Sequence, residues 1–195
     1  YSHLRPMSEL LNARGRADAT AYGTGKRGWR GTRRDCSIMP PALVIGYGNC
    51  LRSDDGAGRY AAQQLAARLP TQIATVLETH QLLPEMAQLV SQAQLVVLID
   101  AALDSPAGLI QQQRIEPDER AGLAASVFGH HLGAAQLVTA AKRLFGRWPE
   151  TMLFTVNGQS FDVGDVCSQP VVEALPLLVD QVEKLVIATI SLKNS

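Results

Sequence analysis

Three aspartates and two histidines supply the residue types that metal binding and acid–base chemistry require. Asp54 and Asp55 follow a glycine-containing segment, Asp100 ends an apolar run, and His130 and His131 precede a helical pattern. Two carboxylates and an imidazole make a ligand set that suits Zn, Ni, Fe or Mn better than Ca, which prefers oxygen alone. The sequence contains neither a His-Glu-x-x-His zinc motif nor a Gly-x-Ser-x-Gly nucleophile elbow. These five residues are therefore the candidates for a site.

Each candidate also has a purely structural explanation. Ser53, Asp54 or Asp55 could cap the helix that follows, because a carboxylate or hydroxyl satisfies its first amide groups. Asp100 could bond the backbone of a turn, and the histidines could be surface or capping residues. Two acids in succession leave one free for chemistry if the other serves as a cap.

The elements that must position these residues alternate between apolar strands and amphipathic helices. From residue 39 onward we expect strands over 42–45, 73–77, 95–99, 109–115 and 152–156, and helices over 57–69, 82–90, 132–145 and 171–190, the last kinked or broken early at Pro176. This order predicts an α/β fold with three α/β/α layers and a mostly parallel, twisted five-stranded sheet. In such sheets ligands bind beyond the carboxyl ends of the strands, where the candidates lie.

Residues 1–38 differ from this body, which we expect to form one α/β domain over 39–195. The leader holds eight of the 18 Lys and Arg residues but three of the 18 Asp and Glu residues, and it lacks apolar periodicity. We expect it to be disordered. It could be a basic arm for nucleic acid or a partner, an organelle transit peptide, or a segment foreign to the natural protein. We favour the third interpretation because the chain opens with Tyr1 and Met39 stands just before the first strand.

Composition excludes several functional classes. No apolar run approaches the roughly 20 residues that span a bilayer, and the N-terminus lacks the apolar core of a secretion signal. The three cysteines are too few for a disulfide framework, so we expect a cytoplasmic protein with no membrane association. Because acidic residues outnumber basic ones after residue 38, we expect no nucleic-acid binding.

Several short motifs resemble those of a known family. They are Gly46-Tyr47-Gly48-Asn49-Cys50-Leu51 followed by Asp54-Asp55-Gly56, then His80-Gln81-Leu82-Leu83-Pro84-Glu85, Asp100-Ala101 and His130-His131-Leu132. In this order they resemble the motifs of the hydrogenase maturation proteases, which process the large subunit of nickel-iron hydrogenases. The resemblance runs from about residue 43 to about residue 186.

The resemblance implies an endopeptidase that removes the C-terminal extension of the hydrogenase large-subunit precursor after nickel insertion. Its metal-contacting positions fall on Asp55, Asp100 and His130, and the nickel is expected to arrive with the substrate. Because a histidine must be neutral to bind a metal, this contact should weaken below roughly pH 6. Water could be activated by the metal, or by Asp55 and Asp100 acting as a pair that shares a proton. We expect the protein to act as a monomer.

Two other functions compete with this one. A non-catalytic nickel-binding or docking module in hydrogenase assembly could use the same three side chains. A nucleotide-binding enzyme is suggested by Gly46 and Gly48, but the third glycine of that fingerprint is replaced by Leu51. Cys50 has only a weak claim to reactivity.

Overall fold

The computed structural model describes residues 41–118 and 132–193. The leader, residues 1–38, and both His130 and His131 lie outside these ranges. The elements in chain order are β1 (Ala42–Tyr47), the short 3-10 helix η1 (Ser53–Gly56), α2 (Ala57–Arg68), β2 (Ala74–Thr79), α3 (Met86–Gln92), β3 (Leu95–Ala102), β4 (Ile110–Arg114), α5 (Ala134–Phe145), β5 (Glu150–Asn157) and α6 (Gln169–Lys193).

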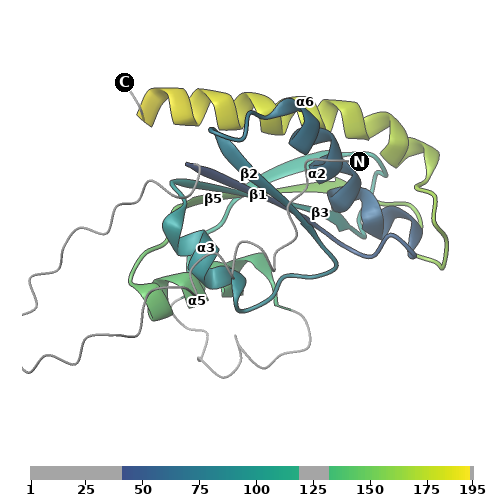
Figure 1. Cartoon of the computed structure of the whole chain (residues 1–195). Coiled ribbons are helices and arrows are strands. Elements are labelled where there is room, and N and C mark those ends of the chain that lie inside the picture. The colour runs from purple at the N-terminus through teal and green to yellow at the C-terminus, as the bar shows by residue number, and fades with distance from the viewer. Residues whose placement is uncertain (1–40, 119–131, 194–195) are drawn as a thin grey trace, which may run out of the picture.

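The five strands form one sheet in the order β2-β1-β3-β5-β4. β1 pairs in parallel with β2 and β3, and β3 pairs in parallel with β5. Only β4, at one edge, is antiparallel to its neighbour β5 among the described strands. Helices α2 and α6 cover one face of the sheet, and α3 and α5 cover the other (Figure 1). The predicted three-layer fold with a mostly parallel five-stranded sheet is confirmed.

The core lies in two layers, one on each side of the sheet. On one side Val44 packs with Leu178 of α6, and on the other Ile45 packs with Met86 and Leu137 of α3 and α5. Successive strand residues point to opposite faces, so a strand covered on both faces must be apolar throughout. Burying each such side chain contributes roughly 1.5–3 kcal/mol. The two layers therefore hold the strand ends in a fixed arrangement.

Helices α3 and α6 of the structure differ most from the predicted helices. The helix expected over 82–90 begins only at Met86, and Leu82 is buried from the preceding loop with 3% exposure. Leu82 matches the spacing of apolar residues in a helix, which explains the predicted boundary, but its backbone lies outside α3. The last helix is longer than expected and continues through Pro176, so no early turn interrupts it. Buried side chains on both sides of the proline, Leu175 and Leu178, hold it against the sheet.

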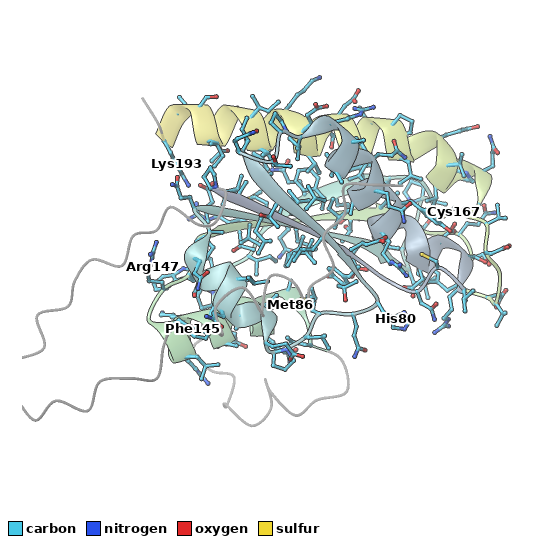
Figure 2. The ribbon with its side chains drawn as sticks, viewed as in Figure 1. His80, Met86, Phe145, Arg147, Cys167 and Lys193 are labelled. Carbon is cyan, nitrogen blue, oxygen red and sulfur yellow. The ribbon has the colours of Figure 1, made fainter. Side chains whose placement is uncertain are left out.

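Figure 2 shows the two ends of the sheet. His80 and Cys167 lie at one end, and Arg147 and Lys193 lie at the opposite end. The first end carries the loops that follow β1, β2 and β3. None of the helices within residues 41–118 and 132–193 has the length and apolarity needed to cross a bilayer.

Candidate active site at the carboxyl ends of the strands

The loop that leaves β1 is folded tightly against η1. Gly48 has a φ of +133°, and a Cβ atom there would lie 1.8 Å from the backbone oxygen of Asp55. A side chain is therefore excluded both by backbone strain and by lack of space. The amide of Asn49 then donates a 2.9 Å hydrogen bond to Oδ2 of Asp55. The glycine that suggested a nucleotide fingerprint instead allows the loop to hold this carboxylate.

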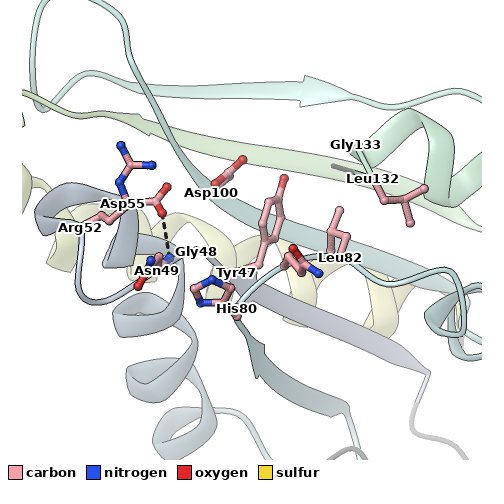
Figure 3. Close-up of a pocket in the computed structure, with 11 residues that line it drawn as sticks. Tyr47, Gly48, Asn49, Arg52, Asp55, His80, Leu82, Asp100, Leu132 and Gly133 are labelled. Carbon is pink, nitrogen blue, oxygen red and sulfur yellow. Dashed lines mark hydrogen bonds between the residues drawn. The ribbon is translucent and has the colours of Figure 1, made fainter. Parts of the chain in front are cut away.

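Asp55 and Asp100 face the same cavity, which has a volume of about 400 Å³. Asp55 comes from η1, after β1, and Asp100 lies near the end of β3. The two strands are neighbours, with Gly46 paired to Ile99, so the sheet brings the two acids together. Tyr47, Arg52 and His80 line the same cavity (Figure 3).

Asp100 has an unusual environment for a carboxyl group. The pKa of Asp100 is raised to about 6, mainly by burial and to a smaller extent by the nearby negative charge of Asp55. Hydrogen bonds from the Tyr47 hydroxyl and from the Ala101 amide, the latter at 2.8 Å, act in the opposite direction on this pKa. Burial next to Asp100 also raises the pKa of Tyr47, which keeps the phenol protonated as a donor. The pKa of Asp100 therefore lies above the ordinary range of an aspartate carboxyl group.

Asp54 points away from the cavity and is fully buried. It accepts hydrogen bonds from the amides of Gln159, Ser160 and Ser168 and from the Ser168 hydroxyl, at 2.6–2.8 Å. Burial alone would raise the pKa of Asp54, but these hydrogen bonds outweigh it and hold that pKa below its usual range. Asp54 thus fixes the loop between β5 and α6 against η1.

The alternative in which Ser53, Asp54 or Asp55 caps the following helix is not observed. Neither η1 nor α2 has a side-chain cap. Instead, the Ser53 hydroxyl donates to the backbone oxygen of Asp162 at 3.0 Å, and the Asp54 carboxylate accepts from the amide of Gln159 in the same loop. Both side chains therefore join η1 to the loop after β5, a contact between distant segments that a rule based on local sequence does not consider.

His130 and His131 lie outside the described residues, so the predicted third ligand stays a prediction. The described chain resumes at Leu132, which lines the cavity together with Gly133. Within the described ranges no three His, Cys, Asp or Glu residues are grouped to hold a metal ion. The two carboxylates, however, offer oxygen atoms from neighbouring elements to one space, and a cation between them would relieve their mutual repulsion.

Sequence reasoning assigned no role to Tyr47, Arg52 or His80. Tyr47 ends β1 and His80 directly follows β2, so the rule that ligands bind beyond strand ends could have found both. Arg52 gave no such signal, because its place depends on a bond to a distant loop. Its Nε donates to the Phe161 oxygen at 3.1 Å.

No protein-family model matches the sequence, and no curated protein does. Several solved structures do resemble this protein. The hydrogenase maturation protease HycI from Thermococcus kodakarensis superposes with a TM-score of 0.60 at 20% identity, over 77% of this chain and 94% of that chain. The hydrogenase maturating endopeptidase HybD from E. coli gives 0.59 at 22% identity, over 76% and 93%. HybD from Thermococcus kodakarensis gives 0.54 at 22% identity, over 74% and 98%. The resemblance that the motifs indicated is therefore confirmed at the level of structure: this chain has the fold of the hydrogenase maturation proteases.

Proposed function

We propose that the protein is an endopeptidase that removes the C-terminal extension of a nickel-iron hydrogenase large-subunit precursor after nickel insertion. The placement of Asp55 and Asp100 at one cavity, in this fold, is the observation that carries the proposal. The solved structures with the same fold are described as hydrogenase maturation proteases or endopeptidases. The proposal includes action as a monomer in the cytoplasm.

Nickel enters this proposal as part of the substrate. Asp55, Asp100 and His130 would contact the nickel that the precursor carries. That contact would place the peptide bond next to the cavity and so reduce the entropic cost of the reaction. Only a precursor that already contains nickel would then be cut, which explains why cleavage would follow insertion.

The ionisation of Asp100 supports a carboxylate-based activation of water. With a pKa of about 6, Asp100 is ionised in part of the population near neutral pH and protonated in the rest. A pair in which one carboxyl is protonated and the other ionised can accept a proton from water and donate one to the leaving amine. Asp55 supplies the second carboxylate of this pair, and the protons would move through the carboxylate oxygens that do not contact nickel.

Incubation of the purified protein with hydrogenase precursor, with and without nickel, tests the proposal by product mass. Loss of a C-terminal peptide only from the nickel-loaded precursor is the expected result. Retention of nickel without any cleavage would instead favour the docking module.

Substitution of the two carboxylates tests the site itself. Asp55→Asn and Asp100→Asn should each slow cleavage of the nickel-loaded precursor at least 100-fold, because the proton-transferring pair is lost. Asp180→Asn on α6 is the matched control, since Asp180 forms only an exposed ion pair with Arg68. Full activity of Asp100→Asn would remove Asp100 from the catalytic site.

A further inference from the structure

Apart from the nickel that the proposed substrate would carry, the two carboxylates of the cavity disfavour the negative charge that peptide hydrolysis develops. When water attacks a peptide carbonyl, the oxygen gains negative charge, and Asp55 and Asp100 would repel that charge. Among the described residues that line the cavity, Arg52 is the one with a permanent positive charge. Figure 3 shows Arg52 on the Asp55 side of the cavity, at the same end of the sheet as Asp100.

The position of Arg52 is fixed on both its backbone and its side chain. The Arg52 backbone amide donates to the backbone oxygen of Asn49 at 2.9 Å, and the Arg52 backbone oxygen accepts from the backbone amide of Asp55 at 3.1 Å. Its backbone also forms an isolated parallel bridge with Gly164. The Arg52 side chain is exposed, and the bond from its Nε to the Phe161 backbone oxygen orients the guanidinium while leaving both terminal nitrogens out of that bond. A donor fixed before the reaction begins costs no reorganisation when charge develops.

We propose that the terminal nitrogens of Arg52 bind the carbonyl oxygen of the scissile peptide bond and stabilise its negative charge. This inference rests on the proposed endopeptidase function. Water oxygen bonds to the carbonyl carbon, the carbonyl electron pair moves to the oxygen beside Arg52, and the water proton passes to the carboxylate pair. The oxygen then re-forms the carbonyl, the carbon–nitrogen bond breaks, and the proton moves to the amine. One acid and one amine are formed from one peptide and one water.

Arg52 could instead serve only to tie the β1 loop to the loop after β5, through its bond to Phe161. The two roles predict different consequences of substitution. A tie contributes to folding stability and is not replaced by a free ion. A charge at the carbonyl oxygen contributes to the rate, and a guanidinium ion that diffuses into the vacated space can replace it.

The test compares Arg52→Ala and Arg52→Lys with the wild type on nickel-loaded precursor, under single-turnover conditions. Arg114→Ala is the control, because Arg114 lies on β4 and bonds exposed Glu116 at 2.7 Å. Arg52→Ala should lower the cleavage rate about 100- to 1,000-fold, the usual loss for a group that stabilises an oxyanion. Millimolar guanidinium should restore part of that rate in Arg52→Ala and leave Arg114→Ala unchanged. The cleavage rate of Arg52→Lys should lie between those of the wild type and Arg52→Ala, since lysine keeps the positive charge but lacks the two terminal nitrogens of the guanidinium.

Two results would overturn the role of Arg52. One is a cleavage rate of Arg52→Ala equal to that of the wild type. The other is a slow Arg52→Ala that guanidinium does not accelerate, with a lowered melting temperature that identifies a structural tie. Failure of the wild-type protein to cut nickel-loaded precursor is a separate outcome, because it contradicts the endopeptidase function itself.

Discussion

Asp54 and Asp55 are neighbours in sequence with opposite environments. Asp54 is buried under the loop after β5, and Asp55 faces the cavity. The resemblance to a family selected Asp55 for chemistry, and the structure explains why Asp54 is unavailable. The donors that occupy Asp54 lie 105–114 residues away in sequence, so no local rule could have identified them.

Asp54→Asn should lower the free energy of unfolding by about 2–4 kcal/mol at neutral pH, because an amide accepts fewer of the four hydrogen bonds. The pKa of Asp54 is lowered in the folded state, so its ionised form stabilises the protein above the unfolded pKa of about 3.9. This stabilisation is lost as pH falls through the folded pKa. Urea unfolding of the variant and the wild type should therefore show a difference that shrinks at acidic pH. A difference that is the same at pH 7 and at pH 2 would contradict this explanation.

Asp100→Asn should have the opposite effect on stability. The pKa of Asp100 is raised from 3.8 to about 6 on folding, so ionisation of the buried carboxyl destabilises the protein as pH rises through this range. Asparagine carries no charge and avoids this cost. The variant should be more stable than the wild type by about 1–3 kcal/mol at neutral pH, although its cleavage of precursor is expected to be slow. Thermal or urea unfolding at pH 7 and pH 3.5 measures this difference in stability. A variant less stable than the wild type at pH 7 would show that ionisation of Asp100 does not destabilise the protein.

The elements themselves were largely predictable from sequence. Runs such as Leu95–Ile99 are apolar at every position, which indicates a strand covered on both faces, and all five predicted strands are present. The errors fall where tertiary contacts override local pattern. Leu82 is buried from a loop, and Pro176 is tolerated inside a helix that packs on both sides of it. Asp100 was expected just after β3 but is paired within it, opposite Thr155 of β5.

The turn at Gly48 is the element on which the position of Asp55 depends. Gly48→Ala should lower the free energy of unfolding by more than about 3 kcal/mol, the upper end of the cost of backbone strain alone. The additional cost arises because the new Cβ meets the Asp55 backbone. Gly146→Ala is the matched control: Gly146 also has a positive φ, +69°, but a Cβ there meets nothing within 4 Å. The control should lose only about 1 kcal/mol in a urea titration. Equal losses in both variants would mean that strain alone, and not the contact with Asp55, is responsible.

At the scale of the whole molecule, the parallel sheet explains why residues far apart in sequence meet. Loops after β1, β2 and β3 leave the same end of the sheet, so Asp55, His80 and Asp100 all reach one cavity. Strand order could not be read from sequence, and the structure shows that the first and third strands are neighbours. Arg52 could not be found in this way, since its orientation requires the Phe161 oxygen from the segment that precedes α6.

The bond between Asp54 and Ser168 also has a consequence for the order of events during synthesis. Asp55, Asp100 and His130 all precede residue 159, where the groups that hold Asp54 begin. A growing chain therefore contains every predicted ligand before the residues that bond Asp54, and so hold Asp55 in η1, have been synthesised. Contacts between segments separated by 114 residues form late, because the intervening chain must first be brought together. A chain that ends before residue 159 would therefore carry the described lining residues of the cavity without the hydrogen bonds that hold Asp54 and η1.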